Sequence, residues 1–119
     1  MLILVFGLPG TGKSYFSSKL KNMLGANYLN TDRIRENIGK KGDYSDESKQ
    51  LVYNKLYEKT RNYLDKGEDL IIDGTFHKQK RRIRLREIAD EKGHTLYSIL
   101  IRADENTIRS RVKKDRKYS

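Results

Sequence analysis

The chain has 119 residues, a formal net charge of +10 at neutral pH, two histidines and no cysteine. This length predicts one domain over residues 1–119 with a proper core, and the lack of cysteine excludes disulfides and thiolate metal sites. The charge favours polyanionic partners such as nucleotides or nucleic acid, or else reflects a lysine-rich solvated surface. No stretch is apolar enough to span a membrane and no leader precedes the first predicted strand, so we expect a cytoplasmic protein.

The first predicted element is a buried strand over residues 2–6, and the sequence GLPGTGKS follows it directly. These residues match G-x-x-x-x-G-K-[ST], in which glycines let the backbone wrap around a phosphate at the positive end of the next helix. Lys13 offers charge to the outer phosphates, and the Ser14 hydroxyl is a ligand for Mg²⁺. The predicted nucleotide site comprises Gly7, Leu8, Pro9, Gly10, Thr11, Gly12, Lys13, Ser14 and Tyr15.

The remaining elements alternate in type along the chain. A helix over about 13–24 places Phe16, Leu20, Met23 and Leu24 on one face and stops at Gly25; a strand near 27–30 and a helix over about 32–38, capped by Thr31, follow. A long helix capped by Ser45 buries Val52, Leu56, Thr60 and Leu64 and ends at Gly67. A strand over 70–72, a helix over about 78–92 with Leu85, Ile88 and Ala89 inward, a strand over 96–101 and a last helix after Asp104 complete the pattern.

This alternation predicts an α/β architecture, a three-layer P-loop NTPase fold with a parallel sheet of about four strands and helices on both faces. Ligands of such sheets bind beyond the carboxyl ends of the strands. We therefore expect the phosphate loop, the Asn30–Arg35 turn, the Asp73–His77 turn and the segment after Ile101 to meet at one site.

Asp73 ends an apolar strand, as a Walker-B-type carboxylate does. It is predicted to lie beside Ser14 and to hold Mg²⁺ or orient the acceptor. The alternative is an ordinary polar residue at a strand end that caps the next helix.

Asp32 and Arg35 are three residues apart, so they share one face of a first helical turn. The carboxylate is placed to accept the proton of an attacking hydroxyl, and the guanidinium to bind an anionic acceptor. A simple surface ion pair explains the same spacing, and the spacing does not decide between these interpretations.

Two basic segments lie in the second half of the chain. Most charges of HKQKRRIRLR, residues 77–86, fit a solvated helix face, although Lys78, Arg81 and Arg82 near the helix start are candidates for the substrate mouth. In the segment from Arg109 to Lys117, Arg111 and Arg116 are candidate lid arginines that stabilise a transferring phosphoryl group. A frayed basic C-terminus is the alternative.

Other interpretations are weaker. An N-K-x-D motif is absent, and the D-x-x-G switch fails at Asp73, which is followed three residues on by Phe76. This argues against a GTPase and favours ATP. Tyr53, Tyr57 and Tyr63 fit amphipathic packing better than stacking on bases.

The chain resembles small P-loop kinases, the group of polynucleotide 5′-kinases, zeta-toxin-like kinases and adenylylsulfate kinases. The resemblance rests on GLPGTGKS, YLNTDRIREN, the long helix ending LDKG, DLIIDGTFHKQKRR and ENTIRSRVKKDR. The polynucleotide kinase pattern implies Asp32 as general base, Arg35 as an acceptor ligand, Asp73 at the acceptor and metal, and Arg111 and Arg116 as lid arginines. Adenylylsulfate kinases share the Asp32 and Arg35 spacing, but their D-G-D-N-x-R is here LNTDRIR.

Members of this group continue past the lid into another strand and helix, and this chain stops at Ser119. Either the chain is a shortened piece of such a kinase, or it is a minimal form that compensates by self-association, since the missing edge strand would expose a sheet edge and favour a homodimer.

The sequence thus predicts an ATP- and Mg²⁺-dependent kinase that phosphorylates a hydroxyl of an anionic acceptor. The acceptor is expected to be a nucleic acid 5′-hydroxyl or a nucleotide-like small molecule, with adenylylsulfate as an alternative. The competing hypothesis is a nucleotide-binding module or fragment without significant catalysis that binds nucleic acid through its basic faces.

Overall fold

A computed structural model describes residues 1–102, which form four parallel strands and four helices. The elements are β1 (Leu2–Phe6), α1 (Lys13–Leu24), β2 (Asn27–Asn30), α2 (Thr31–Asn37), α3 (Asp46–Asp65), β3 (Leu70–Gly74), α4 (Gln79–Glu91) and β4 (Leu96–Leu100). The strand order is β2-β3-β1-β4. The predicted last helix, with Arg111 and Arg116, lies outside the described residues.

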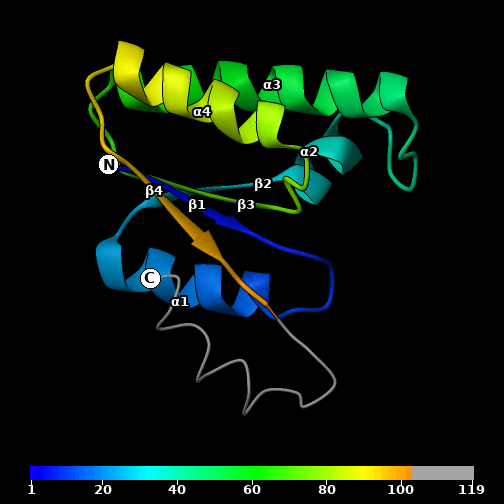
Figure 1. The fold of residues 1–119 in the computed structure, drawn as a ribbon, viewed down its shortest axis with the longest axis horizontal. Helices are drawn as coiled ribbons and strands as arrows, with labels where there is room; N and C mark the ends of the chain where they lie inside the picture. The colour runs from blue at the N-terminus through cyan, green and yellow to red at the C-terminus, as the bar shows by residue number, and fades with distance from the viewer. Residues whose placement is uncertain (103–119) are drawn as a thin grey trace.

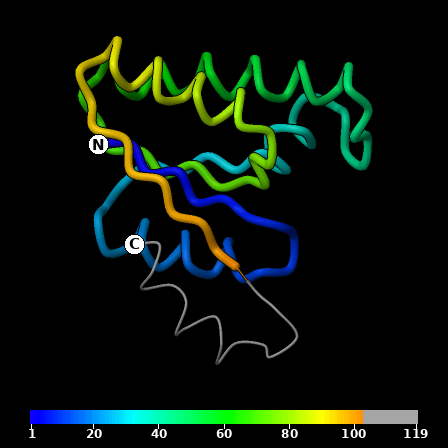
Figure 2. Tube along the Cα trace, viewed as in Figure 1, coloured from blue at the N-terminus to red at the C-terminus, as the bar shows by residue number. Residues whose placement is uncertain are grey.

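Helices cover both faces of this sheet, as Figure 1 shows: α3 and α4 lie side by side on one face, and α1 lies on the other. The trace in Figure 2 shows the same three layers. The predicted three-layer α/β fold is therefore confirmed. None of the helices within residues 1–102 combines the length and the apolar character that crossing a membrane requires.

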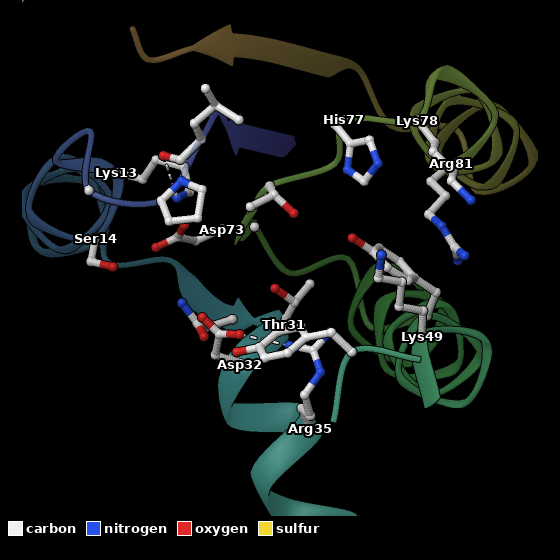
Figure 3. Close-up of a pocket in the computed structure, with 18 residues that line it drawn as sticks. Lys13, Ser14, Thr31, Asp32, Arg35, Lys49, Asp73, His77, Lys78 and Arg81 are labelled. Atoms are coloured by element: carbon white, nitrogen blue, oxygen red, sulfur yellow. Dashed lines mark hydrogen bonds and ion pairs between the residues drawn. The ribbon is translucent and has the colours of Figure 1, made fainter. Parts of the chain in front are cut away.

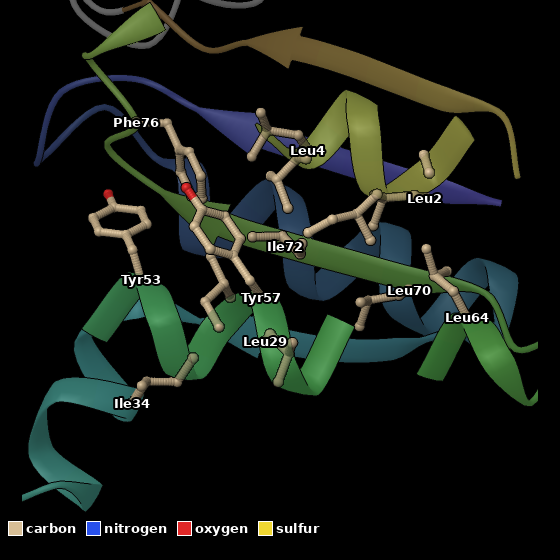
Figure 4. Close-up of a cluster of buried hydrophobic side chains, with 14 of the residues drawn as sticks. Leu2, Leu4, Leu29, Ile34, Tyr53, Tyr57, Leu64, Leu70, Ile72 and Phe76 are labelled. Carbon is tan, nitrogen blue, oxygen red and sulfur yellow. The ribbon is translucent and has the colours of Figure 1, made fainter. Parts of the chain in front are cut away.

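Side chains of β1 point alternately to the two faces of the sheet, so this strand contributes to the core on both faces. Leu2 and Leu4 point toward α3 and α4, where they join Leu56 and Ile72 in a large buried cluster (Figure 4). Ile3 and Val5 point to the other face and join a smaller cluster against α1. A strand buried on both faces has no polar positions, which is why LILVF is apolar throughout.

Two details of the helices differ from the sequence prediction. Asn30, rather than Thr31, caps α2, because the Asn30 side chain accepts a hydrogen bond from the backbone N–H of Arg33. Met23 and Leu24 are exposed, not buried: all residues of the last turn of α1 are exposed. Helical periodicity indicates which side of α1 is apolar but not where the packing surface of the sheet ends.

Candidate active site

The carboxyl ends of the parallel strands bring three of the four predicted segments together; the fourth, after Ile101, lies outside the described residues except for Arg102. Asp73 at the end of β3 is in register with Val5 of β1 and with Asn30 of β2. The phosphate loop follows β1 and α2 follows β2, so both begin at this edge of the sheet. A cavity of about 470 Å³ lies here, and it is lined by the phosphate loop, α2, the first turns of α3 and α4, and the β3–α4 turn (Figure 3).

The phosphate loop is held in its turn by its own side chains. The Leu8 carbonyl accepts hydrogen bonds from the Thr11 hydroxyl, at 2.8 Å, and from the Lys13 ammonium, at 3.2 Å. Gly10 and Gly12 have φ of 77° and 89°, a region that residues with a Cβ rarely adopt. The loop backbone therefore enters α1 with the positive φ angles that a nest of N–H groups around a phosphate requires.

Eight of the predicted site residues line this cavity, and four predicted nucleotide-loop residues do not. The lining residues are Leu8, Pro9, Gly10, Lys13, Ser14, Asp32, Arg35 and Asp73. The other four are Gly7, Thr11, Gly12 and Tyr15. Of these, Tyr15 is 63% exposed and pairs with Lys19 through a cation–π contact. Gly7 and Thr11 line a neighbouring cavity of about 290 Å³, beside the end of β4.

Asp73 is almost fully buried and is held by a tyrosine that sequence reasoning missed. The Tyr28 hydroxyl donates a hydrogen bond of 2.7 Å to Asp73 Oδ2. Burial, with this bond, raises the pKa of Tyr28 to about 12, so the phenol stays protonated and remains a donor. The contact fixes the carboxylate at the cavity wall, while the predicted role of Asp73 at the metal stays a prediction.

Asp32 and Arg35 face each other as their spacing predicted. Arg35 Nη1 lies 2.7 Å from Asp32 Oδ1, and the arginine is 5% exposed whereas the Asp32 side chain is 73% exposed. The Tyr44 ring covers the guanidinium at 4.3 Å. Arg35 Nε is buried without a hydrogen-bond partner among the described residues. A buried guanidinium with a spare donor is suited to an anionic ligand.

The buried side chain of Phe76 anchors the β3–α4 turn. Phe76 is fully buried with a φ of 43°, an uncommon conformation for a residue with a side chain. Its ring meets Tyr53 edge to face at a centroid distance of 5.1 Å. The Arg82 guanidinium donates to its carbonyl. This anchoring places Thr75, His77 and Lys78 at the cavity wall.

Gly74 is required where β3 passes α2. A Cβ on Gly74 would lie 2.8 Å from the Thr31 methyl carbon and 2.9 Å from its hydroxyl oxygen. Such contacts are closer than packed side chains permit. The glycine therefore lets the end of β3 approach α2, so that Asp73 and Asp32 open into one cavity.

Lys49 and Arg81 complete the wall opposite the phosphate loop (Figure 3). Lys49 was missed because only the buried stripe of its helix was read from the sequence. Arg81 was a candidate for the substrate mouth, and it lines the cavity. However, it is 9% exposed and lies over the Tyr53 ring at 4.0 Å, so it does not belong to a solvated face. Arg82, the companion candidate, lies by β4 instead, over the Phe6 ring.

The tyrosines of α3 belong to the core. Tyr53 and Tyr57 are 5% and 9% exposed, and burial raises the pKa of both phenols. This burial confirms the predicted packing of both rings, and Tyr63 packs partly buried against the same cluster.

The cavity is electropositive. Five cationic side chains line it, Lys13, Arg35, Lys49, Lys78 and Arg81, against the carboxylates of Asp32 and Asp73. The geometry defines a P-loop nucleotide-binding fold with a second, cationic compartment across the cavity from the loop.

Comparison with known proteins places the chain in a family. A family model described as an AAA domain, AAA_33, matches residues 2–118, and the chain belongs to this family. Uncharacterized proteins of Mycobacterium bovis and Mycobacterium tuberculosis are 31% identical over 100 aligned residues, which cover 74% of this chain. The chain spans about one fifth of the length of these relatives, since it covers 20% of each.

Solved kinases share the fold. A gluconokinase from Sinorhizobium meliloti superposes with a TM-score of 0.68 at 23% identity, covering 92% of this chain and 61% of that one. A sugar kinase from Janibacter superposes with a TM-score of 0.69 at 23% identity, covering 95% of this chain and 66% of that one. Mycobacterium tuberculosis adenylylsulfate kinase, in complex with AMPPNP and adenylylsulfate, superposes with a TM-score of 0.69 at 15% identity, covering 96% of this chain and 67% of that one. The predicted P-loop kinase fold is thus confirmed.

Proposed function

We propose that this domain transfers the γ-phosphoryl group of ATP to a hydroxyl of an anionic acceptor. The observation that carries the proposal is the two-sided cavity: a complete phosphate loop faces a compartment lined by two buried arginines, Arg35 and Arg81, and Arg35 is paired with the carboxylate of Asp32. Phosphoryl transfer depends mainly on positioning and charge stabilisation, and both halves of the cavity offer these.

In the proposed reaction, the loop amides and Lys13 bind the β- and γ-phosphates. The acceptor hydroxyl oxygen forms a bond to the γ-phosphorus as the bond from that phosphorus to the β–γ bridging oxygen breaks, and ADP leaves with that oxygen. Asp32 takes the proton of the hydroxyl through Oδ2, because Oδ1 is bonded to Arg35. Arg35 binds the anionic group of the acceptor.

The donor set at the cavity wall suits Mg²⁺. The Ser14 hydroxyl and the Asp73 carboxylate line one cavity, and oxygen donors of this kind are what Mg²⁺ prefers. When bound, the ion would supply positive charge to the phosphate oxygens. No group of three or more His, Asp or Glu side chains that could hold a metal exists within residues 1–102, so phosphate oxygens and water would complete the coordination.

Lys13→Ala tests the proposal. We expect ATP turnover to fall at least 10²- to 10³-fold, roughly 3–4 kcal/mol of transition-state stabilisation, because the charge on the outer phosphates is lost. Turnover is measured with a 5′-hydroxyl oligonucleotide, adenylylsulfate or no acceptor. Lys19→Ala, an exposed cation on the same helix outside the cavity, is the control. Wild-type turnover in Lys13→Ala would overturn the proposal.

The second candidate function is nucleotide binding without significant catalysis, with nucleic acid held on the basic faces. The net charge of +10 favours it, since such a field attracts polyanions with or without catalysis. Nucleotide binding without turnover in the presence of every acceptor would select this function.

A further inference from the structure

A second cationic groove lies between α3 and α4, outside the main cavity. Its volume is about 460 Å³, similar to that of the main cavity. Its cationic residues are Arg61 on α3 and Lys80, Arg81 and Arg84 on α4, and no carboxylate lines it.

Two cations elsewhere on these two helices have acidic partners. Lys55 pairs with Glu58, and Lys92 of the α4 C-cap pairs with Asp65. By contrast, Arg61 and Lys80 form no ion pair with any residue in the 1–102 range. Arg84 does reach Glu87 at 3.2 Å and Glu91 at 3.9 Å, and it is the only groove cation neutralised in this way within that range. The groove therefore keeps a net positive charge that the described protein does not balance.

Arg81 joins the groove to the main cavity, because its side chain lines both. It lies between the Tyr53 ring and the Tyr57 hydroxyl. Burial raises the pKa of Tyr57, and the charge of Arg81 opposes this rise. Arg81 is nine-tenths buried and has no carboxylate partner among the described residues. A buried guanidinium without a counter-ion is costly unless an anion from outside the domain approaches it.

We propose that the α3–α4 groove binds backbone phosphates of a single-stranded nucleic acid acceptor whose hydroxyl end lies in the main cavity. This proposal rests on the proposed function for the position of that end. Successive phosphates of one chain would meet Arg35 and Lys49, then Arg81, then Arg61 and Lys80. The aromatic side chain lining the groove, Tyr57, is buried, so recognition is through phosphate charge rather than base stacking.

The test compares two charge-matched double variants. Arg61→Gln/Lys80→Gln removes two groove cations, and Lys59→Gln/Arg86→Gln removes one cation from each of the same helices at positions that line neither cavity. Affinity for a 3′-labelled, 5′-hydroxyl single-stranded octanucleotide is measured by fluorescence anisotropy over a range of salt concentrations. ATP is omitted, so the result does not depend on phosphoryl transfer, which the Lys13→Ala assay tests separately.

For the groove variant we expect octanucleotide affinity to fall about three- to tenfold and the salt slope to fall by about 1.4, or 0.7 for each lost phosphate contact. Affinity for a dinucleoside monophosphate, measured by calorimetry, should be unchanged, because that ligand is too short to leave the main cavity. The control variant should behave as wild type in both assays.

Equal losses in the two variants would show general electrostatic attraction and overturn the proposal. The proposal also fails if the groove variant weakens binding of the dinucleotide as much as binding of the octanucleotide. Binding of inorganic polyphosphate to the groove without binding of the octanucleotide would likewise exclude a nucleic acid ligand.

Discussion

At the scale of single residues, the cavity is built by side chains that restrain one another. Tyr28 holds Asp73, Tyr44 covers Arg35, and Tyr53 lies beneath Arg81. Each aromatic ring limits the movement of a charged group while leaving part of that group turned to the cavity. Preorganised charges of this kind need little rearrangement when a phosphoryl group is transferred.

Asp32→Asn separates binding from transfer. We expect ATP affinity to remain and transfer to fall about 10²- to 10⁴-fold, because an amide cannot take the hydroxyl proton. Nucleotide binding is measured by calorimetry and transfer by product formation with the acceptor that supports turnover. Asp46→Asn, which changes an exposed acid in the first turn of α3 outside the cavity, should retain activity. Undiminished transfer by Asp32→Asn would show that another group accepts the proton.

At the scale of elements, the start of α3 positions two cavity residues, Tyr44 and Lys49. Ser45 caps the helix by accepting from the Ser48 N–H at 3.3 Å, as its sequence predicted. Asp43 adds a second restraint: its carboxylate accepts from the Ser48 hydroxyl and, at 3.0 Å, from the Ser45 N–H. These bonds, led by that from Ser48, lower the pKa of Asp43 to about 2.

This shift predicts a pH-dependent contribution to stability. The pKa is about 2 in the folded chain against an ordinary value of 3.8, so the unfolded chain binds this proton first as the pH falls. The contribution is therefore complete above pH 3.8 and is lost as the pH falls toward 2. Asp43→Asn lacks this contribution at every pH. The difference in unfolding free energy between wild type and Asp43→Asn should therefore become smaller as the pH falls from 3.8 toward 2. Urea denaturation at a series of pH values measures it, and a constant difference would contradict the assignment.

At the scale of the whole molecule, β4 forms one edge of the sheet that residues 1–102 build. Within that range it pairs with β1 alone, and Tyr97 on it is 52% exposed. The Ile101 N–H donates to the Phe6 carbonyl at 2.8 Å. Backbone N–H groups of successive strand residues point to opposite sides, so the N–H of Ser98, three residues before Ile101, points away from β1. We keep the homodimer through this edge as a proposal, since an unpaired edge favours strand addition.

Ser98→Pro tests that dimer. The ring removes an N–H that β1 does not use, so the fold should persist while pairing between copies is blocked. We expect sedimentation equilibrium to show a dimer for wild type and for Ser98→Ala, and a monomer for Ser98→Pro. A wild-type protein that stays monomeric at high concentration, or a proline variant that stays dimeric, would rule out this edge as the interface.

The sequence alone predicted the order and type of the described elements, the P-loop kinase fold and the pairing of Asp32 with Arg35. These features follow from local spacing: the short apolar run LILVF before a glycine-rich loop favours a buried strand, the glycines permit the loop, and residues three apart lie on one face of a helix. It also placed Asp73 at the end of a strand, where the register with β1 and β2 brings it to the cavity.

Only the tertiary structure decided which residues of separate helices and strands meet. Arg81 belongs to a basic run that favours a solvated face, yet packing of α4 against α3 buries it over Tyr53 and between two cavities. Tyr28 reaches Asp73 across 45 residues of sequence, and Lys49 faces the phosphate loop from another element. Such contacts depend on the distance and rotation between packed elements, which periodicity within one element does not specify.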